Sequence, residues 1–191
     1  MQKLPGSANL SAGGGVTLKN VALVTYQGIN FPDTPYGLKM ACGENPKRVY
    51  SRKGSGPSTR MGNIAGYRAA WIKATDYRDE HANYEALSVD EKKEAKNPER
   101  DLELETLAGV LDGDIMIRMH CYRADEMMTI LNLAKGFNYN VGNFHHGVEH
   151  YNISSGFAEN PLFGAFWADW WGVKREAYDG IQENIALVDW P

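Results

Sequence analysis

The sequence has no surplus of basic residues, only two cysteines and no long apolar run. Its 20 lysines and arginines are outnumbered by 24 aspartates and glutamates, so the net charge is −4. A chain without excess cations cannot neutralise many phosphates, and we therefore expect neither a nucleic-acid partner nor an anionic membrane partner. The longest apolar runs also fall well short of the roughly 18 residues that a membrane-spanning helix needs.

The two cysteines, Cys42 and Cys121, stand far apart in the sequence. Their spacing predicts neither a disulfide framework nor a Cys-rich zinc site. Residues 1–15 contain no apolar stretch of the kind found in a secretory signal. We therefore expect a protein of a reducing compartment, the cytoplasm.

What the sequence does contain is typical of one globular domain, with 191 residues of which 43% are hydrophobic and 23% charged. Residues 1–15 are rich in Gly, Ser and Ala, which predicts a flexible N-terminal segment. Residues 16–191 are expected to form the domain. No internal repeat or low-complexity tract is evident.

The first half of the domain mixes apolar and polar stretches. Residues 16–26 are β-branched and apolar, which fits a strand, a short helix or both. The run GLKMA at 37–41 predicts a buried strand, and the polar, Gly-rich stretch 43–63 predicts a long loop. Helical spacing of apolar residues predicts helices over 61–86 and 104–111.

The second half has a regular rhythm of strands and helices. Strands are expected at 115–121, within 137–145 and at 162–168 (the last one buried), and helices at 127–134, 150–158 and 177–188, with Gly136 as the end of the first helix. Strand and helix alternate at intervals of roughly 25 residues, which is typical of βα units with a parallel sheet. The predicted fold class is therefore α/β, with parallel strands alternating with helices.

Two histidines occupy matching positions in successive units. His120 lies near the end of one predicted strand and His146 at the end of the next. Parallel neighbours in a barrel bring both imidazoles to the rim where active sites form, and imidazole is a good zinc ligand. The alternative is that each is a hydrogen-bonded structural residue. His145 in a strand points away from His146, so we interpret it as a packing or supporting residue.

Lys39 is the third candidate, because it stands inside a short apolar strand. A buried lysine has a lowered pKa and becomes a nucleophilic amine. Such an amine takes up carbon dioxide to form a carbamate, which is an anionic oxygen ligand for metals. The alternative is that Lys39 extends to solvent at the edge of the sheet.

These residues stand in runs that resemble a known family. IRMHCYRADEM, followed one unit later by FHHGVEHY, resembles strands five and six of the metal-dependent amidohydrolase superfamily, above all its imidazolonepropionase-like and prolidase-like members. GLKMACGEN resembles the fourth strand, where a carboxylated lysine bridges two metals, and FWADWWG resembles strand seven, part of the substrate pocket wall. The resemblance implies a partial TIM-type (β/α) barrel over residues 16–189. It also implies that Lys39, His120 and His146 are ligands of a divalent metal, with zinc expected and Lys39 carboxylated.

The function implied by the resemblance is hydrolysis of a carbon–nitrogen bond in a small-molecule amide or cyclic amide. Metals in this family lower the pKa of a bound water and polarise the scissile carbonyl. Tyr122 and Arg123, just past strand five, are the expected substrate contacts. Asn45, Arg48 and Arg60 are further candidates, because family members place substrate-contacting groups on the loop after strand four.

The sequence departs from the family at both ends of the barrel. No His-x-His pair of the strand-one type occurs, and no aspartate matches the general base of strand eight, because Asp169, Asp179 and Asp189 fall in the wrong units. The catalytic base is therefore unassigned. We expect the central part of a barrel, a fragment whose activity would require groups from partner segments. Its open sheet edges predict a homo-oligomer.

Two other functions compete with the hydrolase. One is a non-catalytic barrel remnant that binds a metal or small ligand and oligomerises. The other is an unrelated α/β binding protein in which Trp167, Trp170 and Trp171 form a stacking wall. The alternative for these three aromatic residues is packing in the core.

Overall fold

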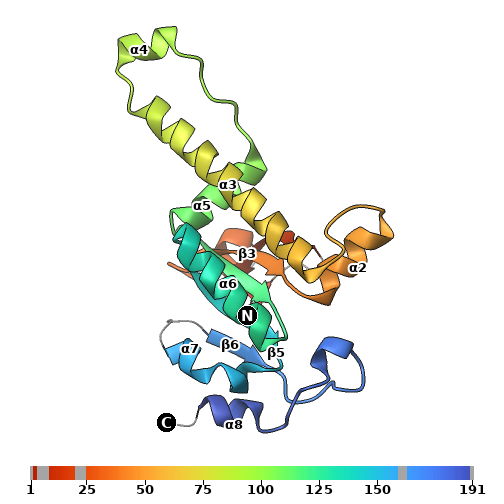
Figure 1. Ribbon diagram of the computed structural model, residues 1–191. Helices are drawn as coiled ribbons and strands as arrows, with labels where there is room; N and C mark the ends of the chain where they lie inside the picture. The colour runs from red at the N-terminus through yellow and green to blue at the C-terminus, as the bar shows by residue number, and fades with distance from the viewer. Residues whose placement is uncertain (1, 4–8, 20–24, 159–162, 190–191) are drawn as a thin grey trace.

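The computed structural model describes residues 2–3, 9–19, 25–158 and 163–189 (Figure 1). The strands are β1 (Gln2–Lys3), β2 (Ser11–Thr17), β3 (Tyr36–Ala41), β4 (Ile115–His120), β5 (Val141–Gly147) and β6 (Phe163–Phe166). The α-helices are α1 (Tyr26–Ile29), α2 (Glu44–Arg52), α3 (Arg60–Glu85), α4 (Val89–Glu94), α5 (Leu102–Leu111), α6 (Ala124–Phe137), α7 (Ser154–Ala158) and α8 (Asn184–Val188). Two 3₁₀ turns, η1 (His150–Asn152) and η2 (Arg175–Ala177), complete the elements.

The strands form one six-stranded sheet in the order β1 to β6. β3, β4, β5 and β6 run parallel, whereas β1 and β2 add an antiparallel ribbon beside β3. Each connection between parallel strands contains helix, as the crossover of a parallel pair requires. This arrangement confirms the predicted α/β fold with parallel strands and agrees with part of a TIM-type barrel.

The two faces of the sheet have different chemistry because side chains alternate along each strand. Leu38, Met40, Ile117, Met119 and Phe144 are at most 2% exposed and belong to the main hydrophobic core. Trp71 of α3 and Met127 and Ile130 of α6 pack into the same core. The alternate residues of the strands, among them Lys39 and His120, therefore lie on the opposite face.

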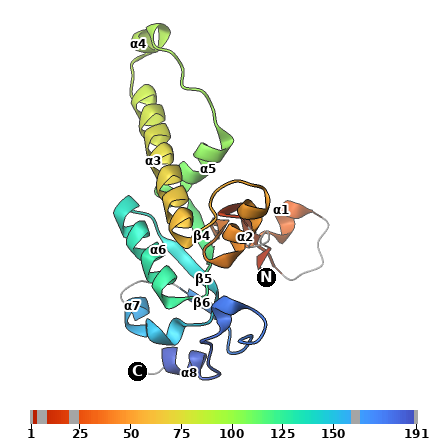
Figure 2. The same cartoon turned by 45° about the vertical axis from the view of Figure 1, so that its right-hand side comes forward.

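Helix α3 is the longest element, and its far half extends away from the sheet toward α4 (Figures 1 and 2). The Thr59 hydroxyl caps its first turn by accepting from the Gly62 N–H at 2.9 Å. Tyr67, Trp71 and Ala74 recur at helical spacing and are buried, so one stripe of the helix faces the core. In the part of the chain that the structure describes, no helix is long and apolar enough to cross a membrane.

Two predicted loops prove to be regular structure. The prediction of a loop over residues 43–63 was wrong in its first half, which forms α2. Glu44 in the first turn and Arg52 in the last turn complement the helix dipole, and Pro46 is tolerated in a first turn. Within the segment 1–15, residues 2–3 form β1 and residues 11–15 belong to β2, which pairs with β3; the predicted flexibility of the segment stays a prediction.

The C-terminal part differs from the prediction in two ways. The single helix expected over 177–188 is split into η2 and α8, with Gly180 between them. Strand β6 was expected to be buried, yet Phe163 is 76% exposed because β6 is the edge of the sheet. The end of α6 is also later than Gly136, since the helix stops at Asn138 in the left-handed region, with φ 56°.

Phe144 and Phe163 offer a matched pair for testing where the core lies. Replacing the fully buried Phe144 by Ala should lower the free energy of unfolding by about 3–5 kcal/mol, because a cavity remains. The same change at exposed Phe163 should cost less than about 0.5 kcal/mol. Urea unfolding followed by circular dichroism measures both, and equal losses would contradict the described core.

Candidate functional site

The register of the parallel strands aligns polar residues from three strands. Ala41, His120 and His145 are paired side by side across β3, β4 and β5. One level deeper, Lys39, Arg118 and Asn143 are paired in the same way. Paired residues of neighbouring parallel strands share a face, so these side chains lie together on the face opposite the main core, near the carboxyl ends of the strands.

His146 joins this group through an irregularity in β5. The register between β5 and β6 shifts between His145 and Gly147, and His146 has a φ of 62°. Its ring centroid lies 4.9 Å from that of His120 and 5.9 Å from that of His145. The expectation that His145 points away from His146 was therefore wrong, because the irregularity at His146 breaks the strict alternation of a strand.

Lys39 lies below the histidines and is only 2% exposed. The alternative that it extends to solvent is thereby excluded. Burial, assisted by the positive charge of Arg118, lowers the pKa of the Lys39 ammonium to about 8. A larger fraction of the amine is therefore neutral near pH 7 than in an exposed lysine.

The three imidazoles are uncharged near neutral pH. Burial is the largest cause for each, and it lowers the pKa of His120 to about 2 and the pKa of both His145 and His146 to about 4. The charge of Lys39 acts on all three rings, and that of Lys174 acts on His120 and His146. Their ring nitrogens are thus available as acceptors or ligands.

The ring nitrogens of the histidines provide some of the ligands that a metal ion would need. His120 Nδ1 and His145 Nε2 are buried without a hydrogen-bond partner, and an orphaned imidazole nitrogen is the kind of atom that a metal or substrate satisfies. Among the residues that the structure places, no group of three or more His, Cys, Asp or Glu could hold a metal ion. The His120 and His146 rings are neighbours and Lys39 is buried on the same face, and their role as metal ligands stays a prediction.

Residues that follow β6 contact the side chains next to the histidines. Lys174 Nζ donates to Asn45 Oδ1 at 2.9 Å and lies 4.2 Å from the centroid of the Tyr122 ring. Glu176 is paired with Lys174 at 2.5 Å and accepts from the Glu44 N–H at 2.8 Å. Sequence reasoning missed Lys174 and Glu176, because nothing in a polar stretch of the last 20 or so residues indicates that it folds back onto α2.

The predicted substrate contacts separate into two groups. Tyr122 and Asn45 lie at the site: the Tyr122 ring stands 4.9 Å from His120, and Asn45 Nδ2 is 3.1 Å from His120 Nε2. Arg123 instead forms ion pairs with Asp125, Glu149 and Asp179. Arg60 faces Glu126 at 3.8 Å, and Arg48 is exposed on α2.

Two of the three tryptophans, Trp167 and Trp170, form a wall beside His146. The Trp167 ring lies 4.4 Å from His146 and stacks on Trp170 at 4.5 Å. Trp167 packs against the small cluster of Tyr122, Val148 and Ala177. Trp170 and Trp171 are 43% and 44% exposed, so core packing does not account for them.

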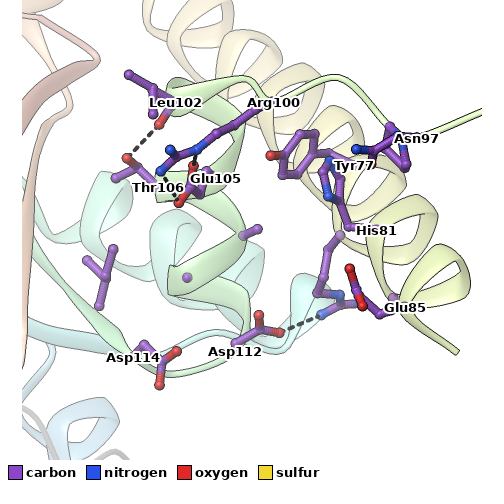
Figure 3. A pocket seen from close by; sticks show the side chains of 16 residues that line it. Tyr77, His81, Glu85, Asn97, Arg100, Leu102, Glu105, Thr106, Asp112 and Asp114 are labelled. Carbon is purple, nitrogen blue, oxygen red and sulfur yellow. Dashed lines mark hydrogen bonds and ion pairs between the residues drawn. The ribbon is translucent and has the colours of Figure 1, made fainter.

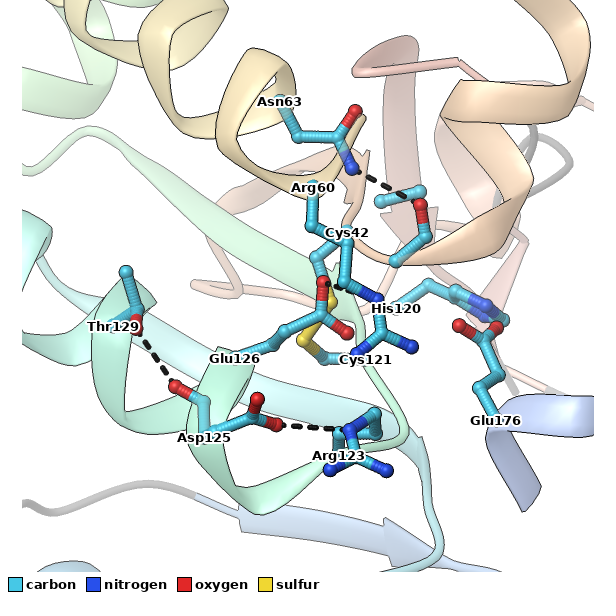
Figure 4. The surroundings of a disulfide bond; sticks show 12 residues. Cys42, Arg60, Asn63, His120, Cys121, Arg123, Asp125, Glu126, Thr129 and Glu176 are labelled. Carbon is cyan, nitrogen blue, oxygen red and sulfur yellow. Dashed lines mark hydrogen bonds and ion pairs between the residues drawn. A yellow bond between two sulfur atoms is a disulfide. The ribbon is translucent and has the colours of Figure 1, made fainter. Parts of the chain in front are cut away.

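Cys42 and Cys121 form a disulfide, contrary to the expectation from their distance in the sequence (Figure 4). Each follows directly on the last residue of its strand, and the pairing of Ala41 with His120 sets the two cysteines side by side, with their Cα atoms 5.3 Å apart. Both are buried. Disulfides are typical of oxidising compartments, and the expected cytoplasmic location stays a prediction.

The side chains of Glu126 and Glu176 both lie near the disulfide (Figure 4), and both approach Gly43. A side chain at Gly43, which has a φ of 73°, would collide with Glu176 and come within 3.2 Å of Glu126 Oε2. Burial raises the pKa of Glu126 to about 7; Arg60 opposes this rise and the charge of Glu176 adds to it. Glycine is therefore required where the chain passes between these carboxylates.

A hollow lies away from the histidines, at the opposite end of the strands (Figure 3). It has a volume of about 1020 Å³ and is lined by α3, α5 and the start of β4. Its charges are paired internally, as in the Arg100–Glu105 and Arg78–Asp112 contacts. None of the predicted site residues lines it, and this end of a barrel serves stability rather than catalysis.

Comparison with known proteins gives two relatives. No family model matches the chain. An amidohydrolase named tasK from Hapsidospora irregularis is 31% identical over 198 residues, which cover 93% of this chain and 20% of that protein. The crystal structure of an amidohydrolase from Thermotoga maritima MSB8 matches with a TM-score of 0.84 and 33% identity, over 98% of this chain and 47% of that one. The resemblance to amidohydrolases is thus confirmed, and the chain spans a fifth of one relative and about half of the other.

The carboxyl of Glu126 should make stability depend on pH. Its pKa in the folded state, about 7, lies above the usual value of 4.5, so its contribution is full below about pH 4.5 and is lost as pH rises through 7. From pH 4.5 to pH 8, Glu126→Gln should gain about 2–3 kcal/mol of unfolding free energy relative to the unchanged chain. Exposed Glu103→Gln is the control, and parallel pH profiles for all three proteins in urea unfolding would contradict the assignment.

The disulfide should stabilise the fold, because it closes a loop of 79 residues in the unfolded chain. Replacing both Cys42 and Cys121 by Ser should lower the free energy of unfolding by about 2–4 kcal/mol. A reducing agent should cause a similar loss in the unchanged protein and none in the double variant. Unfolding of the unchanged chain that is insensitive to reductant would rule the bond out.

Proposed function

We propose that this chain, a relative of the amidohydrolases, carries the central metal-binding part of a hydrolase that cleaves the carbon–nitrogen bond of a small-molecule amide or cyclic amide. The observation that carries the proposal is that the rings of His120 and His146 lie 4.9 Å apart at the carboxyl ends of β4 and β5, with buried Lys39 of β3 on the same face one level deeper. This is the end of a barrel where active sites are built. Zinc is the divalent metal that we propose for imidazole and carbamate ligands.

The roles of the residues follow from their protonation. His120 and His146 offer nitrogen lone pairs at neutral pH because burial keeps both rings uncharged. The neutral Lys39 amine would attack the carbon of carbon dioxide: a nitrogen–carbon bond forms, one carbon–oxygen π pair moves onto oxygen, and the nitrogen gives a proton to solvent water, which yields an anionic carbamate. A bound metal would lower the pKa of a water molecule and polarise the substrate carbonyl.

The remaining groups at the site would hold the substrate. Tyr122 lies beside both histidine rings, and the tryptophan pair extends the wall from His146. Arg123 and Arg60 are engaged with carboxylates, so we propose Tyr122 and Asn45 ahead of them as substrate contacts. The three proposed ligands leave the general base unassigned, and we propose that turnover needs groups supplied outside this set.

A binding function without catalysis is the second candidate. The partial exposure of Trp170 and Trp171 favours it, because large exposed aromatic side chains suit ligand stacking. Self-association through the exposed edge strand β6 would accompany either function. The proposed hydrolase needs a metal at His120 and His146 for its activity, whereas ligand stacking on the tryptophans does not need one.

Metal binding is the first test. The purified chain should bind zinc at micromolar concentration, and the His120→Ala/His146→Ala double variant should lose this affinity by at least about 100-fold, because two ligands are removed. Isothermal titration with elemental analysis measures both. The matched control is His81→Ala on α3, which should bind as the unchanged chain does. A folded chain that binds no zinc, or a double variant that binds normally, would contradict the proposed site.

A further inference from the structure

A short aromatic ladder, made of His146, Trp167 and Trp170, leads from the histidine end of the sheet toward solvent. The Trp167 ring lies 4.4 Å from the His146 ring. Trp170 stacks on Trp167 with ring centroids 4.5 Å apart and 27° between the ring planes. Trp170 is the outermost of the three rings and is 43% exposed. A ligand bound at the histidines can therefore extend along the ladder and reach the Trp170 ring.

The backbone of Trp170 has a conformation that tryptophan rarely adopts. Its φ is 86°, and in the part of the chain that the structure describes the other non-glycine residues with positive φ are Asp33, Asn138 and His146. Aspartate and asparagine enter this region readily, whereas a bulky residue there is an outlier. Such outliers persist only where the surrounding structure enforces them, and they gather at sites that hold ligands. Two of these four residues, His146 and Trp170, belong to the ladder.

Packing explains Trp167 but not Trp170. Trp167 packs against the small buried cluster of Tyr122, Val148 and Ala177, and Trp170 is not a member of that cluster. A glycine would adopt the backbone conformation of Trp170 without steric cost. The chain thus bears a backbone cost for a ring that stays partly open to solvent, which indicates a role in binding rather than in stability.

Both tryptophans of the ladder are fixed by the backbone around them. The buried side chain of Asn184 donates from Nδ2 to the carbonyl oxygen of Trp167 at 2.8 Å. The N–H of Val173 donates to the carbonyl oxygen of Trp170 at 2.9 Å, which closes a turn directly after the ladder. A surface that is ordered before binding loses little conformational freedom when a ligand arrives, and this favours affinity.

The charges near the ladder select among the groups that a tryptophan can bind. The face of an indole ring attracts flat aromatic rings and also cations. The positive charges of Lys39 and Lys174 act on His146, and the Lys174 ammonium already lies 4.2 Å from the centroid of the Tyr122 ring. A further cation would be repelled here, so an uncharged aromatic ring suits the ladder better.

We propose that the ladder is a subsite for a flat, uncharged aromatic group of the ligand, with Trp170 as the ring on which this group stacks. The proposal rests on the proposed function, because it takes the histidine end of the ladder as the place of the scissile amide. It adds the class of substrate, an amide that carries an aromatic group at some distance from the bond to be cleaved. It also assigns the platform to Trp170 rather than to its neighbour Trp171.

Two small amides of similar size test the subsite on the full chain freed of metal. Benzamide carries a flat ring, whereas the ring of cyclohexanecarboxamide is puckered and not aromatic. The indole N–H signals of the five tryptophans are followed by NMR, and Trp167→Phe and Trp170→Phe identify the two signals of the ladder. Benzamide should shift both signals and bind about threefold to tenfold more tightly, because an aromatic pair gains free energy beyond the area that it buries.

The charge argument has its own probe. The benzylammonium cation has the same flat ring as benzamide and should bind more weakly, because the lysines near the ladder repel it. Since no metal is present in these titrations, their outcome is independent of the zinc titration. A failed zinc titration with a clear preference for benzamide would contradict the metal site alone, and the reverse result would contradict the subsite alone.

Variants at position 170 separate a ligand platform from a packing residue. Trp170→Ala and Trp170→Gly should both lose the preference for benzamide, and Trp170→Phe, which keeps a flat ring, should retain part of it. Trp170→Gly should also unfold at a higher temperature than Trp170→Ala, because only glycine adopts the positive φ without cost. The matched control is Trp171→Ala, which removes a neighbouring tryptophan that is 44% exposed and should leave the preference unchanged.

Circular dichroism establishes that each variant is folded. If the two small variants unfold, Trp170→Leu, which keeps apolar bulk without a flat ring, replaces them with the same expectation. The proposal is overturned if the unchanged chain binds the two amides equally or binds neither, or if benzylammonium binds more tightly than benzamide. It is equally overturned if a folded variant without an aromatic ring at position 170 keeps the preference, or if Trp171→Ala loses it.

Discussion

The parallel register of β3, β4 and β5 is the constraint on which the site depends. It pairs Ala41 with His120 and His120 with His145, and it sets Lys39 one level below them. The same register makes Cys42 and Cys121 neighbours just beyond the ends of β3 and β4, where they form a disulfide. A slip of one residue in β4 would move His120 to the helix-covered face and replace it with an apolar neighbour. Core and site are therefore fixed together by one set of backbone hydrogen bonds.

Electrostatics then determines the protonation state of the residues that the strand register brings together. Lys39, Arg118 and Lys174 lie on the side of the sheet that carries the histidines, and their positive charges add to burial in keeping the imidazoles neutral. Glu176 balances Lys174 with a direct ion pair. Burial, together with the charge of Glu176, raises the pKa of Glu126 to about 7, although Arg60 opposes the rise. Neutral imidazoles near a reactive amine are suited to bind a metal, the role that we propose for them.

The sequence predicts those features that depend on local pattern. The strands around Lys39 and His120, the long helix α3 and the alternation of strands with helices follow from periodicity, and the structure has them. Pattern also singled out Lys39, His120 and His146, and the structure places the three on one face. The resemblance to amidohydrolases added their expected role as metal ligands, which stays a prediction. Local pattern does not predict features that arise from tertiary contact. The left-handed φ of His146, the joining of Cys42 to Cys121 and the return of Lys174 to Asn45 each require two distant segments to be placed first.

The central claim is that one ligand position lies between His120 and His146. The most direct test is a crystal of the chain soaked in zinc, with diffraction recorded on both sides of the zinc absorption edge. The account predicts an anomalous peak within about 2.0–2.1 Å of one ring nitrogen of each histidine, the usual zinc–imidazole distance. A zinc-soaked crystal with no peak at these rings, or with peaks only elsewhere on the chain, would contradict it.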